Sequence, residues 1–125
     1  MSLILADTSV WTDHLRTNEP LMNQLVAEER LLMHPYVVGE LSMGNLPDRT
    51  AFMRRLRQMD FAMRASDTEV SRLVEDNCLY GTGIGWVDAH LLASALLTEG
   101  VKLWTRDRRL NDAALRFDRA ALLHH

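Results

Sequence analysis

The chain has 125 residues, which suits one domain and excludes two of ordinary size. Hydrophobic residues make up 47% and charged residues 25%, a balance that excludes a disordered chain. The formal net charge of −3 argues against a protein that holds nucleic acid by bulk electrostatics alone.

The first third of the chain predicts two buried strands separated by helices. Residues 3–6 form a short, continuously apolar run, typical of a strand buried on both faces of a parallel sheet. The polar residues 7–9 follow it and can cap a helix, and Pro20 can open a second one. Residues 31–33 are the second strand candidate, which ends near Pro35.

The middle of the chain predicts three helices and at most one weak strand. We expect helices over residues 37–43 and 48–59, and a weak strand over residues 61–63. Residues 66–69 have the spacing of a capping box, so a further helix should start there and end near Gly81. Cys78 falls in this helical pattern and is expected to be buried; because it is the only cysteine, it excludes an intrachain disulfide.

The last third alternates helix, strand and helix. Residues 81–85 form a glycine-rich loop that lacks the spacing of a phosphate-binding loop. Helices are predicted over residues 86–97 and 110–115, with a strand over residues 101–105 between them. Short apolar strands that alternate with helices indicate an α/β fold with a mostly parallel sheet, whose ligand sites lie at the carboxyl ends of the strands.

The sequence predicts a cytoplasmic protein without a membrane anchor. No apolar run approaches the roughly 20 residues that a membrane helix needs. The apolar start reaches Asp7 too soon to be a signal peptide. His124 and His125 could derive from a vector, so they carry no weight as metal ligands.

Four acidic residues fall where a site is expected. Asp7 and Asp107 each follow a predicted strand, and Asp88 lies in the first turn of its helix. Glu40 interrupts an otherwise apolar helix. Taken singly, Asp7 and Asp88 could be helix caps, Asp107 a turn residue and Glu40 part of a solvated face; jointly, all four could face one sheet edge.

A cluster of four carboxylates would need a cation. Carboxylates that converge within a few ångströms repel one another and raise each other's pKa values. All-oxygen ligands select Mg²⁺ or Mn²⁺ over Zn²⁺. Such an ion activates water and stabilises charge on a phosphodiester, which is the chemistry of a metal-dependent nuclease.

Four segments around these acids resemble the motifs of the PIN-domain family, particularly the VapC-type toxins of bacterial toxin–antitoxin pairs. The four segments, in chain order, are residues 3–11, 38–41, 88–95 and 104–110. They span nearly the whole chain in the order that the family shows. The resemblance therefore extends to residues 1–125 as a single PIN-like domain.

The resemblance implies a three-layer α/β/α fold with a mostly parallel five-stranded sheet. It also implies an endoribonuclease whose four acids, Asp7, Glu40, Asp88 and Asp107, bind Mg²⁺ or Mn²⁺, so that a metal-activated water cleaves RNA. Whether the site binds one metal ion or two remains open. Relatives often carry a further acid one turn after the third, where this chain has His90-Leu91-Leu92.

Hydroxyl residues near the acids are expected to order the site. Ser9 matches a family position with that role, with Thr8 as the less favoured substitute, and Thr105 precedes the fourth acid by two places. Family toxins usually form homodimers and are silenced by a cognate antitoxin, a separate chain whose tail enters the active-site groove.

The arginines near Asp107 are candidate RNA contacts. Residues 102–119 carry six basic and three acidic residues, a local charge of +3, so the rest of the chain carries −6. Arg106, Arg108 and Arg109 flank the fourth acid and could contact phosphate. A solvated run of charge is the equal alternative.

Two other functions stay open. A PIN-like binding module that acts with a DNA-binding partner would bind metal with little or no nuclease turnover. A phosphatase on an α/β sheet is less favoured, because Ser9 occupies the place of the second acid in the D-x-D arrangement that such enzymes use.

Overall fold

Three short parallel strands form the centre of the computed structural model, which describes residues 2–123. They are β1 (Leu3–Ala6), β2 (Leu31–Leu32) and β3 (Val101–Trp104), in the order β2-β1-β3. Leu5 of β1 pairs with Leu32 on one side and Leu103 on the other. The strands are apolar apart from Lys102, because both faces of this sheet are covered, as the sequence predicted.

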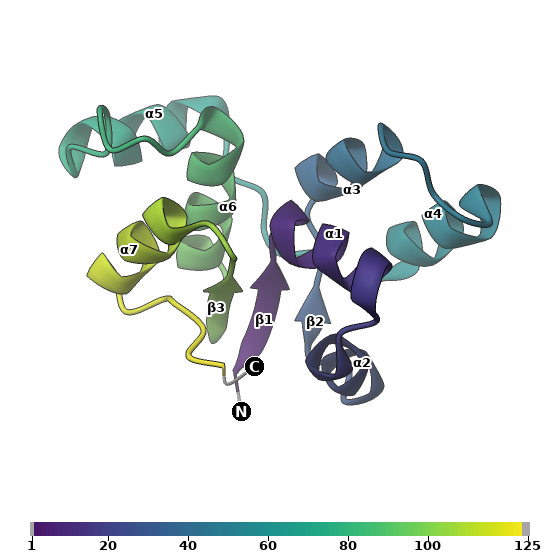
Figure 1. Ribbon diagram of the computed structural model, residues 1–125. Coiled ribbons are helices and arrows are strands. Elements are labelled where there is room, and N and C mark those ends of the chain that lie inside the picture. Colours follow the sequence, from purple (N-terminus) through teal and green to yellow (C-terminus); the bar gives the residue numbers. More distant parts are fainter. Residues whose placement is uncertain (1, 124–125) are drawn as a thin grey trace.

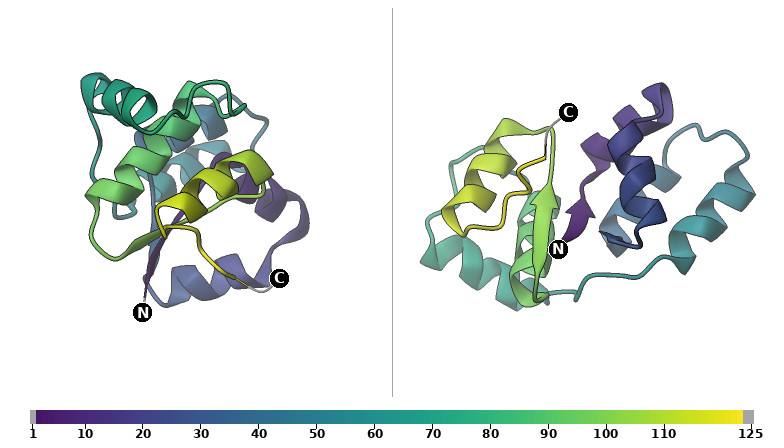
Figure 2. Two further views of the ribbon diagram at one scale, coloured as in Figure 1. Left: turned by 90° about the vertical axis from the view of Figure 1, so that its left-hand side faces the viewer. Right: turned by 90° about the horizontal axis from the view of Figure 1, so that it is seen from below.

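The described residues form seven helices. These are α1 (Thr8–Thr17), α2 (Pro20–Ala27), α3 (Pro35–Ser42), α4 (Arg49–Gln58), α5 (Asp67–Asp76), α6 (Trp86–Leu97) and α7 (Arg108–Arg116). Helices α5 to α7 gather beside β3, whereas α2 to α4 gather beside β2 (Figure 1). The same grouping is visible from below (Figure 2, right). Strand β1, which leads into α1, therefore lies at the seam between the two groups.

Each outer strand is flanked by one isolated parallel bridge. Met33 bridges Phe61 beyond β2, and Ala120 bridges Leu103 of β3. The weak strand predicted over residues 61–63 is thus reduced to one bridge. Phe61 and Met63 remain exposed, so burial does little to hold an extended strand there. The α/β fold with a parallel sheet is confirmed, with three strands among the described residues.

The predicted end of α5 was wrong. The helix ends at Asp76, five residues before Gly81, and Cys78 is exposed rather than buried. Cys78 adopts a left-handed backbone (φ 52°), and the next amide, of Leu79, donates to the Val74 carbonyl. This turn places Leu79, rather than Cys78, in the core.

Two helices begin two residues earlier than predicted. Pro35 opens α3, because its fixed φ suits the first helical position. Asp107 caps α7, so that helix starts at Arg108. No helix of the described residues is long and apolar enough to span a membrane. His124 and His125 lie outside the described residues.

Candidate carboxylate site

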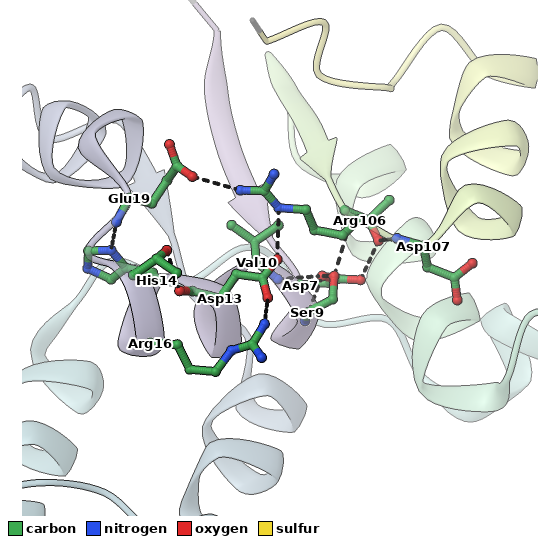
Figure 3. Close-up of polar contacts among 11 residues, drawn as sticks. Asp7, Ser9, Val10, Asp13, His14, Arg16, Glu19, Arg106 and Asp107 are labelled. Carbon is green, nitrogen blue, oxygen red and sulfur yellow. Dashed lines mark hydrogen bonds and ion pairs between the residues drawn. The ribbon is translucent and has the colours of Figure 1, made fainter. Parts of the chain in front are cut away.

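Asp7 lies at the carboxyl end of the central strand, where it both continues the sheet and caps α1. Its amide donates to the Trp104 carbonyl at 2.9 Å. Its Oδ1 accepts hydrogen bonds from the amides of Ser9 (2.9 Å) and Val10 (3.3 Å), and a short one from the Ser9 hydroxyl. Its Oδ2 accepts from Thr105 Oγ1 at 2.5 Å. Both carboxylate oxygens are therefore fixed in direction (Figure 3).

Burial destabilises the ionised form of the Asp7 carboxyl. Only 5% of the residue is exposed, and burial raises the pKa of its carboxyl although the hydrogen bonds from Ser9, Thr105 and the Val10 amide lower it. No basic side chain of residues 2–123 forms an ion pair with it. A buried carboxylate of this kind is stabilised by an added cation.

Two hydroxyl groups connect the end of β3 to the start of α1. Ser9 Oγ accepts from the Arg106 amide at 3.0 Å, and Thr105 Oγ1 accepts from the Asp107 amide at 2.9 Å. Each hydroxyl also donates to Asp7. Ser9 and Thr105, the two residues expected to order the site, thus both contact its first acid.

Asp107 and Asp88 stand at helix starts on the β3 side of the seam. Asp107 caps α7 through the amides of Arg109 (2.8 Å) and Leu110 (3.5 Å). Asp88 lies in the first turn of α6 and accepts from the Gly85 amide at 3.2 Å. Asp88 therefore has the local capping role that the sequence left open, whereas Asp107 caps a helix where the alternative expected was a turn residue. Both lie at a helix start, which favours negative charge.

The electrostatics of Asp88 link the four acids. Burial raises the pKa of its carboxyl most, the Gly85 hydrogen bond lowers it, and the charges of Asp7, Asp107 and Glu40 raise it further. Mutual repulsion of this kind requires that the carboxylates lie near one another. Asp7, Asp107 and Glu40 therefore lie near enough to Asp88 for their charges to act on it.

Glu40 approaches from α3 on the opposite side of the seam. It is exposed, and its Oε1 accepts from Thr8 Oγ1 at 2.7 Å. Thr8, the less favoured candidate for ordering the first acid, thus holds the second acid instead. The hydrogen bond ties α3 to the first residue of α1.

The donor chemistry of this site fits a hard divalent cation. All four side chains offer carboxylate oxygens, the ligands that Mg²⁺ and Mn²⁺ prefer. The raised pKa values of Asp7 and Asp88 mark negative charge that nothing described in the chain neutralises. As placed, no three acidic, histidine or cysteine side chains among residues 2–123 enclose a common point at metal-binding distance.

The three candidate RNA-binding arginines differ in their surroundings. Arg106 forms ion pairs with Asp13 (3.3 Å) and Glu19 (3.0 Å), so its charge is used within the chain (Figure 3). The side chain of Arg109 lies against Gly83, and Arg108 is exposed. Nothing in the spacing of Asp13 and Glu19 signalled their pairing with Arg106, about 90 residues away.

A row of aromatic and imidazole rings connects α3 with α6, and the sequence analysis did not find it. His90 is fully buried, with its ring 4.7 Å from Tyr36 and 4.9 Å from Trp86, and its Nε2 lies 3.0 Å from Asp67 Oδ1. His34 also packs against Tyr36, with the ring centroids 5.2 Å apart. The only signal of these ring contacts in the sequence is that His34 and Tyr36 are two residues apart.

Comparison with known proteins gives one family and two close relatives. The family model for the PIN domain matches residues 4–115, a range that includes all four acids. Ribonuclease VapC32 from Mycobacterium tuberculosis (strain CDC 1551 / Oshkosh) is 40% identical over 111 residues, which cover 89% of this chain and 90% of the relative. The protein of the same name from strain ATCC 25618 / H37Rv matches to the same extent.

Proposed function

The chain belongs to the PIN-domain family, and from that premise we propose that it is a metal-dependent endoribonuclease, the toxin of a toxin–antitoxin pair. The two relatives that match over nine-tenths of the chain are named as ribonucleases. The observation that carries the proposal is the hydrogen-bonded link at the carboxyl ends of β1 and β3, where Thr105 donates to Asp7 Oδ2 and accepts from the Asp107 amide. The charges of Asp7, Asp107 and Glu40, which raise the pKa of Asp88, support it.

Asp7, Glu40, Asp88 and Asp107 would hold Mg²⁺ or Mn²⁺ and would form the catalytic site. When bound, such an ion supplies Lewis acidity toward water and toward the phosphodiester. The number of ions is left open by a set of four acids.

The chain's own contribution is to hold these acids ready. Ser9 and Thr105 donate to the two oxygens of Asp7, which favours its ionised form against the effect of burial. Thr8 restrains Glu40, and the Gly85 amide restrains Asp88. Groups that are oriented before substrate arrives reduce the reorganisation that the reaction requires. Arg108 and Arg109 remain the better candidates for contacts with RNA, since Arg106 is paired with acids.

Further features follow from the family as proposals. The isolated bridges at Phe61 and Ala120 support a fourth and a fifth strand in a three-layer α/β/α fold, and residues 1–125 would form one domain. A cognate antitoxin chain and a second copy of the toxin would be its partners, and RNA in the cytoplasm its substrate.

The decisive experiment is cleavage of a mixed cellular RNA pool by purified protein without antitoxin, with Mg²⁺, with Mn²⁺ and with chelator. We expect cuts that require metal and that disappear in Asp7→Asn. A folded protein that binds metal, shown by a rise in its melting temperature, and yet cuts no RNA would instead support the binding-module alternative.

A further inference from the structure

An open, mainly apolar groove of about 370 Å³ lies directly beside the carboxylate site. Helix α3 lines it with Tyr36, Glu40 and Met43, and α6 lines it with Trp86 and Val87. Met43 is 87% exposed and Trp86 is 47% exposed. Large apolar side chains that gather at a concave surface mark a binding site more often than solitary ones do.

Trp86 is held in place although half of it faces solvent. Its ring meets the buried His90 ring edge to face at 4.9 Å, and His90 is in turn fixed by Tyr36 and Asp67. A rigid, half-exposed indole offers a flat apolar surface that loses little conformational entropy on binding. Every nucleobase has a π-face that stacks on such a ring.

The groove is continuous with the proposed catalytic acids. Glu40 lines the groove and also belongs to the acid cluster, and Trp86 shares the first turn of α6 with Asp88. A group bound against Trp86 therefore lies next to the place where the phosphodiester would be cut. The chemistry that fits is an apolar ring attached to a phosphate backbone.

Arg64 places a positive charge against Tyr36, one of the residues that line the groove. The guanidinium of Arg64 lies 5.1 Å over the Tyr36 ring, and its Nη2 donates to the Tyr36 hydroxyl at 3.3 Å. Among the described residues no carboxylate pairs with Arg64. A guanidinium that has no carboxylate partner suits an anionic ligand.

We propose that this groove binds one unpaired nucleobase of the RNA by stacking on Trp86, with the adjoining phosphate near Arg64. The inference rests on the proposed function and deepens it, because it assigns the binding of one base to a named side chain; a base that reaches Trp86 has left its stack. Trp86 is then a substrate-binding residue rather than a packing residue.

The test is binding of a short single-stranded RNA by the full chain in chelator, where no cleavage occurs. Stacking on an aromatic ring predicts that Trp86→Ala weakens binding about 5- to 150-fold. Trp86→Phe should keep most of the affinity. Tyr80→Ala is the matched control, since Tyr80 is an exposed aromatic residue that does not line the groove.

Two further readouts locate the base. An abasic nucleotide moved along the RNA should weaken binding at one position only, and that loss should vanish in Trp86→Ala. RNA should also quench the tryptophan fluorescence of the wild type but not of Trp86→Phe, because Trp11 and Trp104 are only 4% and 2% exposed.

The outcomes separate this inference from the proposed nuclease. The inference is overturned if wild type and Trp86→Ala bind the RNA with equal affinity. If Trp86→Ala also changes the oligomeric state while its RNA affinity is unchanged, the groove binds a second copy of the chain instead. If Trp86→Ala fails to fold, the wild type is tested with the series of abasic RNAs. The inference is overturned if no abasic position weakens binding to the wild type. If binding depends on the base at one position but no metal-dependent cleavage occurs, the base-binding groove is supported and the proposed nuclease activity is contradicted.

Discussion

Thr105 joins two candidate acids through one hydroxyl group: its Oγ1 donates to Asp7 Oδ2 at 2.5 Å and accepts from the Asp107 amide at 2.9 Å. A threonine hydroxyl has one proton to give, so the direction of both hydrogen bonds is fixed. The contact spans 98 residues and couples the ends of β1 and β3.

Thr105→Val keeps the shape of the side chain and removes this link. We expect RNA cleavage or metal affinity to fall by roughly 10- to 100-fold, as is usual when a group that orients a metal ligand is lost. Thr105→Ser should retain most of the activity. Thr17→Val is the control, since its hydroxyl bonds only within α1, to the Asp13 carbonyl. Full activity in Thr105→Val would show that the link does not orient Asp7.

Substitutions of Asp7 should separate its two roles. Asn caps helices as well as Asp does, so Asp7→Asn should abolish metal-dependent cleavage and leave the melting temperature within a few degrees of wild type. Asp7→Ala removes the cap as well and should lower the free energy of unfolding by about 1 kcal/mol more. The measurements are cleavage in Mg²⁺ and thermal unfolding in chelator.

Asp88→Asn should stabilise the metal-free protein. Burial and three neighbouring carboxylates raise the pKa of Asp88, so at pH 7 its charge opposes folding. Removing that charge should add about 0.5–1 kcal/mol, a small gain because Asp88 is only half-buried and solvent screens it. Thermal unfolding in chelator measures the change.

The same variant tests the metal site directly. Mg²⁺ should raise the melting temperature of the wild type and do so much less in Asp88→Asn. Asp112→Asn on the surface of α7 is the control, because Asp112 is exposed and is not among the acids that act on Asp88. An equal shift in all three proteins would place the ion elsewhere.

His34 should make the fold sensitive to mild acid. Burial first, then the positive charges of His90 and Arg64, lower its pKa from 6.5 to about 4. Between pH 6.5 and 4 the unfolded chain binds a proton that the folded chain refuses, so the free energy of unfolding falls by up to about 1.4 kcal/mol per pH unit.

His34→Asn provides the check. Nδ1 of His34 caps α3 by accepting from the Tyr36 amide at 3.0 Å, and an asparagine oxygen can do the same. The variant should lose much of the stability change between pH 6.5 and 4 in denaturant titrations. His14→Asn should alter it less, because His14 is only partly buried.

Gly83 should accept a side chain poorly, chiefly because of its backbone. Its φ is +93°, and a Cβ there would lie 2.7 Å from Arg109 Cδ. Gly83→Ala should therefore cost about 1–3 kcal/mol for the backbone, and a smaller further amount for displacing the flexible Arg109 side chain. Gly81→Ala, at φ +73° with open space around it, should show only the backbone cost. Adding Arg109→Ala to Gly83→Ala should recover the difference between them.

The sequence predicted those strands and helices whose residue pattern depends on the local sequence alone. The apolar runs at residues 3–6, 31–33 and 101–105 became strands, and helix α6 begins and ends at the expected residues, 86 and 97. The end of α5 depends on a turn that brings Leu79 into the core. That choice between Cys78 and Leu79 is made by tertiary packing, which a local pattern does not contain.

The candidate site was predictable in outline because parallel strands deliver their carboxyl ends to one edge. The rule placed Asp7 near Asp107, and the hydroxyls of Ser9 and Thr105 followed from the resemblance. The pairing of Arg106 with Glu19, and the groove between α3 and α6, arise from contacts across the fold. Spacing along the chain carries no information about either.

The four acids are scattered from residue 7 to residue 107, and the hydroxyl that orients the first of them arrives with the last strand. A chain still emerging from the ribosome without β3 has Asp7 but neither Thr105 nor Asp107. Under the proposed function, such a chain does not yet cleave the messenger RNA that encodes it. On that proposal, the capacity to cut RNA is complete only after residues 105 to 107 have been added and folded.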